Sequence, residues 1–302
     1  MDLFGNEILT TQTLADKYLM CPTSVLNKRD PKWSELKRKW TKLGIKSEVG
    51  RDSMFMNFSG SKDISILTTE SWSDSTKDVV NKMASMTKGQ SIFDPVLCEI
   101  IYRWFCIPNG KILDPFAGGS VRGIVANKLG FKYTGIELRE EQCLSNREQA
   151  IEILKINNQP QWYCGDSDEV LNDNFIIEYD LLFSCPPYMG LEVYSDLPED
   201  LSNMKDADFE IKYNSIIKKS CNLLKKGGYA VFVVGDVRDK KTGYYKDFTG
   251  MTKQAFIKSG MKLYNELILI EPVGTKAMTL ERGFKNGKLA KVHQNVYIFV
   301  KP

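Results

Sequence analysis

Apolar and polar positions change their spacing along the chain, and the change occurs near residue 110. Beyond that point, short apolar runs of strand length alternate with longer amphipathic stretches of helix length. The runs expected to form strands are 112–113, 132–138, 162–164, 180–184, 229–235, 262–270 and 292–300. Strands that alternate with helices at this spacing predict an α/β fold with a doubly wound, mostly parallel sheet.

Two features refine this pattern toward its end. No helix pattern separates the runs 262–270 and 292–300, so we expect them to form an antiparallel hairpin that closes the sheet. The helix before the fifth strand is expected over 208–226, because the following Gly227-Gly228 is a common helix stop.

Residues 1–90 lack the alternation and are expected to form a small N-terminal region, separate from a main domain over 91–302. The segment from Lys28 to Arg51 contains nine basic and three acidic residues, and Trp33 and Trp40 lie seven positions apart within it. On a helix this spacing places both tryptophans on one face. Two interpretations stay open: contact with the phosphates and bases of DNA, or a solvated helix whose tryptophans pack on the main domain.

The composition narrows the possible functions. The net charge is only +3 over 302 residues, so nucleic-acid binding requires local basic patches rather than the overall field. Seven cysteines without a CxxC pair, together with a single histidine, argue for reduced thiols and against a zinc site or a histidine-based triad. No apolar run reaches the roughly 18–20 residues of a membrane span, and the first residues lack a signal-peptide pattern, so we expect a cytoplasmic protein.

Acidic residues stand at the ends of three successive predicted strands: Asp114, Glu137 and Asp166. Because the carboxyl ends of parallel strands meet at one edge of a sheet, we expect these carboxylates to converge on one ligand. Gly118 and Gly119 allow the backbone to approach that ligand and lead into a helix N-terminus. No Lys-Ser/Thr pair follows them, so a phosphate loop is not indicated. A positively charged, hydroxyl-rich ligand fits better.

The fourth predicted strand ends in a different motif, Ser184-Cys185-Pro186-Pro187-Tyr188. Each proline fixes φ and lacks an amide donor, so the hydrogen-bond ladder of the sheet must end there. The result is a rigid turn at the ligand-binding edge, with a thiol before the prolines and an aromatic ring after them.

These motifs resemble those of S-adenosylmethionine-dependent amino-methyltransferases of DNA. One stretch of this chain resembles the cofactor motif of that family: Asp114-Pro115-Phe116-Ala117-Gly118-Gly119. Its catalytic motif, usually Asp, Asn or Ser before Pro-Pro and an aromatic residue, resembles the turn that ends at Tyr188. The family segment that contacts the methionine end of the cofactor resembles Phe93-Asp94-Pro95. The resemblance covers about 91–302, and the whole chain is similar to phage-encoded DNA methyltransferases. It implies a Rossmann-like class I methyltransferase fold.

The resemblance also implies roles for the residues of the cofactor site. Asp114 and the backbone of Gly118-Gly119 would hold the methionine part of S-adenosylmethionine, Glu137 the ribose, and Asp166 the adenine amino group. The side chains expected to pack on the cofactor are those of Phe116 and Ile136. No metal is required.

At the catalytic turn, the resemblance implies that Cys185 and the Pro186 carbonyl accept hydrogen bonds from the target amino group. Tyr188 would stack on a base flipped out of DNA, with adenine favoured over cytosine. The basic segment from Thr275 to Lys291 would contact DNA phosphates or base edges, unless it is a plain solvated hairpin tip.

Two residues depart from the family pattern. Ser120 stands where a second glycine is usual, and Cys185 stands where an oxygen acceptor is usual, although a thiol is only a weak acceptor. Cys185 leaves two alternatives open: a cytosine carbon-5 methyltransferase with Cys185 as nucleophile, and a catalytically silent DNA-binding protein. An RNA methyltransferase is a third alternative, because similar Pro-Pro-aromatic turns occur in enzymes that act on guanine amino groups of structured RNA.

Overall fold

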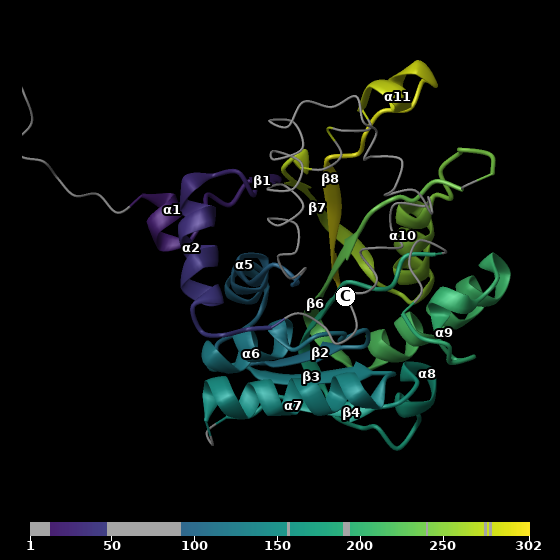
Figure 1. The fold of residues 1–302 in the computed structure, drawn as a ribbon. Helices are drawn as coiled ribbons and strands as arrows, with labels where there is room; N and C mark the ends of the chain where they lie inside the picture. Colours follow the sequence, from purple (N-terminus) through teal and green to yellow (C-terminus); the bar gives the residue numbers. More distant parts are fainter. Residues whose placement is uncertain are drawn as a thin grey trace, which may run out of the picture.

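The computed structural model describes residues 13–46, 92–155, 158–189, 194–239, 241–274, 277 and 280–302. In this part of the chain a single sheet carries helices on both faces (Figure 1). The strands are β1 (Val25–Asn27), β2 (Lys111–Asp114), β3 (Lys132–Glu137), β4 (Gln161–Cys164), β5 (Tyr179–Ser184), β6 (Leu224–Val234), β7 (Lys262–Ile270) and β8 (His293–Val300). The helices are α1 (Leu14–Lys17), α2 (Pro31–Thr41), α5 (Pro95–Phe105), α6 (Val121–Lys128), α7 (Glu140–Leu154), α8 (Ser167–Val170), the short 3-10 helix η2 (Leu201–Asn203), α9 (Asp206–Asn222), α10 (Phe248–Lys258) and α11 (Leu280–Lys285).

The strands follow the order β1-β7-β8-β6-β5-β2-β3-β4. β2 pairs in parallel with both β3 and β5, so the strand order reverses at β2. β8 lies antiparallel between β6 and β7. This order, with one antiparallel strand inserted beside the last parallel one, is that of the Rossmann-like class I methyltransferase fold. It confirms the predicted doubly wound sheet and its antiparallel closing hairpin.

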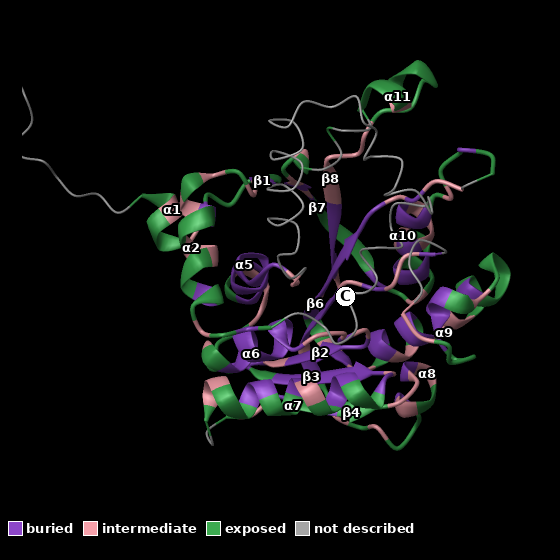
Figure 2. Ribbon diagram, viewed as in Figure 1, coloured by how far each residue is buried: buried purple, intermediate pink, exposed green. Residues whose placement is uncertain are grey.

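Burial on both faces explains why the central strands are almost wholly apolar. Successive side chains of a strand point to opposite faces, and helices cover each face. Leu181 and Phe183 of β5 pack in the cluster that contains α5 and α6, whereas Leu182 packs in the cluster that contains α9 and α10. Figure 2 shows these strands and helix α5 as the buried interior of the molecule.

The N-terminal segment adds a strand that the sequence pattern does not reveal. β1 pairs in parallel with the edge strand β7, from Val25 opposite Ile268 to Asn27 opposite Ile270. The strand is three residues long and buries Leu26 alone, so it offers no alternation for a pattern to detect.

Helix α2 packs on α5 through two tryptophans. Trp33 and Trp40 are both buried, and their indole Nε1 atoms donate to Asp94 Oδ2 at 3.2 Å and to Glu99 Oε2 at 2.7 Å. The interpretation in which the tryptophans pack on the main domain is therefore confirmed. The domain boundary predicted near residue 90 lies outside the described residues.

Helix α9 ends earlier than predicted. It ends at Asn222 and β6 begins at Leu224, so Gly227-Gly228 lies inside a strand and its predicted role as a helix stop is wrong. The ammonium of Lys301 donates to the carbonyls of Cys221 and Asn222 at 2.9 and 3.1 Å, which satisfies the end of the helix without a glycine. Gly227 instead lies within β6 with a φ of +76°, a backbone conformation that glycine adopts more readily than other residues.

A short helix, α11, occupies the connection between β7 and β8, where the sequence pattern predicts none. Its apolar side chains Leu280 and Phe284 are 41% and 70% exposed. Because the helix buries no apolar stripe, its sequence carries no periodic signal. Across the described residues, every helix is too short or too polar to cross a membrane.

Candidate active site

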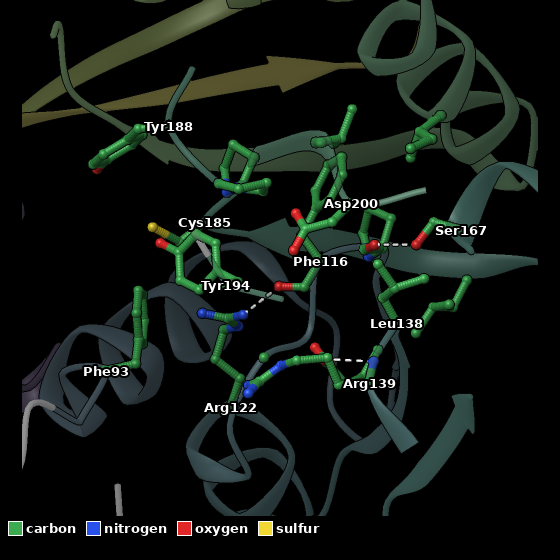
Figure 3. Close-up of a pocket in the computed structure, with 18 of the residues that line it drawn as sticks. Phe93, Phe116, Arg122, Leu138, Arg139, Ser167, Cys185, Tyr188, Tyr194 and Asp200 are labelled. Atoms are coloured by element: carbon green, nitrogen blue, oxygen red, sulfur yellow. Dashed lines mark hydrogen bonds and ion pairs between the residues drawn. The ribbon is translucent and has the colours of Figure 1, made fainter. Parts of the chain in front are cut away.

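A cavity of about 390 Å³ lies at the carboxyl ends of the strands, next to the point where the strand order reverses (Figure 3). Ligands of open α/β sheets bind at this position, and the volume is within the range of roughly 300–1,000 Å³ that is usual for small-molecule sites. Residues that end or follow four strands share its wall. They are Pro115, Phe116 and Gly118 after β2, Glu137, Leu138 and Arg139 at β3, Asp166 and Ser167 after β4, and Cys185, Pro186, Pro187 and Tyr188 after β5.

The turn after β5 places its thiol and its ring in the cavity wall, as expected from the sequence. Ser184, the last strand residue, is fully buried, and its hydroxyl donates to Asp114 Oδ1 at 2.5 Å. The Tyr188 ring packs edge-to-face with the Phe248 ring, with ring centroids 5.7 Å apart. Its hydroxyl accepts a hydrogen bond from Gln294 Nε2 at 3.1 Å. Burial, followed by the neighbouring Cys185, raises the pKa of Tyr188 well above its ordinary value, so the phenol stays protonated.

Asp114 lies behind the cavity wall. Its side chain is fully buried, and its carboxylate accepts hydrogen bonds from Arg122 Nε, from the Tyr133 hydroxyl at 2.7 Å and from Ser184. The Phe116 amide is a further donor, at 3.2 Å. Asp114 therefore joins the loop after β2 to the turn after β5. Gly119 and Pro95 also lie outside the wall, whereas Gly118, with a φ of +52°, is part of it.

The other two acidic strand ends do line the cavity. Glu137 Oε1 accepts from the Arg139 amide at 3.0 Å, and the Arg139 Nε atom lies 3.4 Å away. Asp166 Oδ2 lies 2.6 Å from the ammonium of Lys212, which is itself part of the wall. A ligand amino group at Asp166 would share this carboxylate with Lys212.

The N-terminal segment reaches the same cavity. Asp94 caps α5 by accepting from the Val96 amide at 3.0 Å, and its Oδ2 lies 3.7 Å from the ammonium of Lys28. Lys28 also pairs with Glu271 at 2.9 Å, and all three charged groups line the cavity together with Phe93. Lys28 is thus a wall residue of the cavity rather than an outer surface contact.

Several wall residues carry no signal in the sequence. Wall residues to which the sequence gave no role in ligand binding include Arg122, Arg139, Lys212, Glu271 and Gln294. They belong to helices, loops and strands that only the tertiary fold brings to one place. Within the described ranges, no group of three or more His, Cys, Asp and Glu side chains could hold a metal ion.

No protein-family model matches the chain, and no curated protein matches it in sequence. Among solved structures, TrmN from Thermus thermophilus is similar over 74% of this chain and 53% of its own, with 16% identity and a TM-score of 0.49. The chain therefore spans about half the length of that protein.

Two further solved structures are similar over most of their own length. A TehB-like S-adenosylmethionine-dependent methyltransferase from Corynebacterium glutamicum is 16% identical, with a TM-score of 0.43, over 76% of this chain and 97% of its own. The magnesium protoporphyrin IX methyltransferase from Synechocystis, solved with bound S-adenosylmethionine, is 11% identical, with a TM-score of 0.45, over 78% of this chain and 100% of its own.

Proposed function

We propose that the cavity binds S-adenosylmethionine and that the protein methylates an exocyclic amino group of a base in DNA, with adenine favoured over cytosine. One observation carries the proposal. The turn Cys185-Pro186-Pro187-Tyr188 shares a single cavity with Glu137, Asp166 and the glycine loop after β2. A methyl donor and its acceptor base must bind side by side in one cavity. Here the carboxylates and the glycine loop suit the donor, and the turn suits the base.

The residues of the wall fit the proposed cofactor. The Glu137 carboxylate suits the two ribose hydroxyls, and the apolar faces of Phe116 and Ile136 suit the nucleoside. Phe116 is held by stacking on Tyr213, with ring centroids 5.8 Å apart. Gly118 adopts a backbone conformation that favours glycine, which keeps the loop close to the ligand. When bound, S-adenosylmethionine supplies a methyl group already activated on a sulfonium centre.

The catalytic turn provides the acceptor side of the reaction. The Pro186 carbonyl and Cys185 accept hydrogen bonds from the target amino group and orient its nitrogen lone pair toward the methyl group. Tyr188, which Phe248 and Gln294 hold in place, offers a ring face on which a flipped base stacks. Positioning supplies most of the rate enhancement in such a site.

The decisive experiment is mass spectrometry of nucleosides after incubation of DNA and RNA with the protein and labelled S-adenosylmethionine. We expect the label in N6-methyladenine, or in N4-methylcytosine, from DNA, and none after incubation with heat-inactivated protein. Label confined to RNA or to 5-methylcytosine would contradict the proposal. Cofactor binding without label in any nucleoside would favour the silent DNA-binding alternative instead.

The proposed DNA contact nearest the catalytic turn is the segment from Thr275 to Lys291, of which the structure describes 277 and 280–291. Lys291 lies beside the start of β8, within 3.1 Å of His293, and Gln294 of the same strand contacts Tyr188. The described basic side chains that precede it are those of Arg282, Lys285 and Lys288. The exposed basic side chains of the segment from Lys28 to Arg51, which is described up to residue 46, form a second proposed contact. Lys28, in the cavity wall, and the buried Trp33 and Trp40 are not part of it.

Replacing Arg282, Lys285 and Lys288 together by alanine is expected to weaken DNA binding and to lower its salt dependence. If each contacts a phosphate, the slope of log K against log salt falls by about 2–3. Cofactor affinity should not change. Fluorescence anisotropy with labelled duplex DNA at several salt concentrations measures the slope.

A matched control replaces the exposed lysines Lys128, Lys132 and Lys155, which surround the opposite ends of the strands. This variant removes the same net charge and should keep the wild-type slope. An equal loss of slope in both variants would count against a specific contact at the 282–288 segment.

A further inference from the structure

A hairpin over 237–246, described except for residue 240, follows β6. Because β6 runs parallel to β5, the hairpin leaves the sheet at the edge where the cavity lies. Arg238 and Tyr245 form an antiparallel bridge across it, and the Lys246 amide donates to the Val237 carbonyl at 3.0 Å. Figure 1 shows the hairpin, in light green, projecting beyond β6 and α10.

The tip of this hairpin is held in one shape by its own side chains. The Asp239 carboxylate accepts from the amide and the hydroxyl of Thr242, at 2.7 and 2.9 Å. Arg238 Nη1 donates to the Gly243 carbonyl at 2.9 Å, and its guanidinium lies 3.9 Å from the centre of the Tyr245 ring. Gly243 has a φ of +77°, which favours glycine. The tip is therefore preorganised, so little conformational entropy is lost when it binds a partner.

Tyr244 is the aromatic residue that this tip presents to solvent. Its side chain is 77% exposed, whereas the neighbouring Tyr245 lies under the guanidinium of Arg238. A single exposed aromatic residue is common on protein surfaces. An exposed ring on a preorganised hairpin differs, because it offers a flat apolar face that is already fixed in position. Such a face suits stacking on a nucleic-acid base.

Both ends of the hairpin lie beside the tyrosine of the catalytic turn. Gly235, which joins β6 to the hairpin, is so close that a Cβ atom there would lie 3.7 Å from the Tyr188 hydroxyl oxygen. Phe248, which follows the hairpin, packs edge-to-face with the Tyr188 ring. At the tip, a Cβ atom on Gly243 would lie 2.7 Å from the ammonium nitrogen of Lys288. The hairpin thus connects the catalytic turn with the proposed DNA contact.

The surface around the tip is positively charged. Its exposed cations are Lys241 on the hairpin and Arg282, Lys285 and Lys288 on the adjacent segment. Of the two nearby carboxylates, Asp239 is engaged by the turn and Glu281 pairs with Lys285. Cations around an exposed aromatic ring complement a chain of phosphates with bases between them.

We infer that the hairpin enters duplex DNA beside the target base and that Tyr244 stacks in the space which this base leaves. The inference rests on the proposed function and specifies its substrate as double-stranded DNA. A flipped base leaves its neighbours without a stacking partner, and an inserted apolar side chain replaces it. Tyr188 then holds the base in the cavity, while Tyr244 occupies the gap in the duplex.

The test compares Tyr244→Ala with the wild type on three forms of one DNA site that the wild-type protein methylates. The forms are the matched duplex, the duplex with the target base mispaired, and the single strand. We expect single-turnover methyl transfer to fall about 10- to 100-fold on the matched duplex, because the lost stacking then opposes flipping. On the single strand the change should stay within about twofold, since no pair is opened there, and on the mispaired duplex it should be intermediate.

Two matched variants accompany this test. Tyr244→Trp keeps an aromatic face at the tip and should retain most of the rate on the matched duplex. Tyr264→Ala removes another exposed tyrosine, 60% exposed, in the first half of β7 and hence toward the opposite edge of the sheet. It should keep the wild-type rate on all three forms of DNA.

The outcomes separate this inference from the proposed function. A wild-type rate of Tyr244→Ala on the matched duplex would overturn the inference and leave DNA methylation standing. An equal loss on the duplex and on the single strand would also overturn it, because the ring would then contact the strand without assisting flipping. If the wild-type protein methylates no form of DNA, the proposed function falls and this inference falls with it.

Discussion

Asp114→Asn is expected to lower the free energy of unfolding by about 3–5 kcal/mol, the usual cost of removing one partner of a buried ion pair. The substitution keeps the size of the side chain but leaves the Arg122 cation, 6% exposed, without its anion. It also weakens the acceptor that the Tyr133 and Ser184 hydroxyls share. Urea unfolding followed by tryptophan fluorescence measures the change.

The control for this prediction is Glu281→Gln, which makes the same chemical change at a surface ion pair. Glu281 lies 2.8 Å from Lys285, and both side chains are more than 70% exposed. Water and salt screen such a pair, so the variant should unfold like the wild type. An Asp114→Asn protein as stable as the Glu281→Gln protein would show that the buried network around Asp114 does not support the fold.

Tyr188→Ala is expected to lower the rate of methyl transfer about 10- to 100-fold, because stacking of a base on an aromatic ring contributes about 1–3 kcal/mol. Affinity for S-adenosylhomocysteine should be retained, since the ring is assigned to the base. Single-turnover transfer to DNA and calorimetric titration with S-adenosylhomocysteine measure the two quantities separately.

Tyr188→Phe is the matched variant for this prediction. It keeps the ring and its edge contact with Phe248 and removes the hydroxyl that accepts from Gln294. We expect it to retain most of the transfer rate. Full activity of Tyr188→Ala would remove the stacking role, and an equal loss in both variants would place the effect in the hydroxyl instead of the ring.

The sequence predicts the edge of the sheet at which the cavity lies, because strand ends form the main walls of the cavity. The apolar runs that end at Glu137 and Ser184 form β3 and β5, which lie on either side of β2 in the sheet. Parallel strands bring their carboxyl ends to one edge whatever the details of the helices. Local sequence patterns therefore predict which residues lie at this edge of the sheet. Glu137, Asp166 and Cys185 line the same cavity for that reason.

For Asp114 the sequence predicts a direct contact with the ligand, whereas the structure places its buried carboxylate behind the cavity wall. The residue ends its strand as predicted, but Tyr133, Ser184 and Arg122 surround its carboxylate from three other elements. An acidic residue at a strand end has the same local pattern whether its side chain faces the ligand or the interior. Only the packing around it distinguishes the two.

By itself, the sequence determined the order of the strands from residue 111 onward and of the long helices between them, the closing hairpin and the edge of the sheet at which a ligand would bind. These properties depend on hydrophobic spacing within single elements. The tertiary structure alone decided the pairing of β1 with β7, the contact of Lys28 with Glu271 and the position of Arg122 in the wall. Each of these depends on contacts between parts of the chain that are distant in sequence, such as the 243 positions between Lys28 and Glu271, and no local pattern records them.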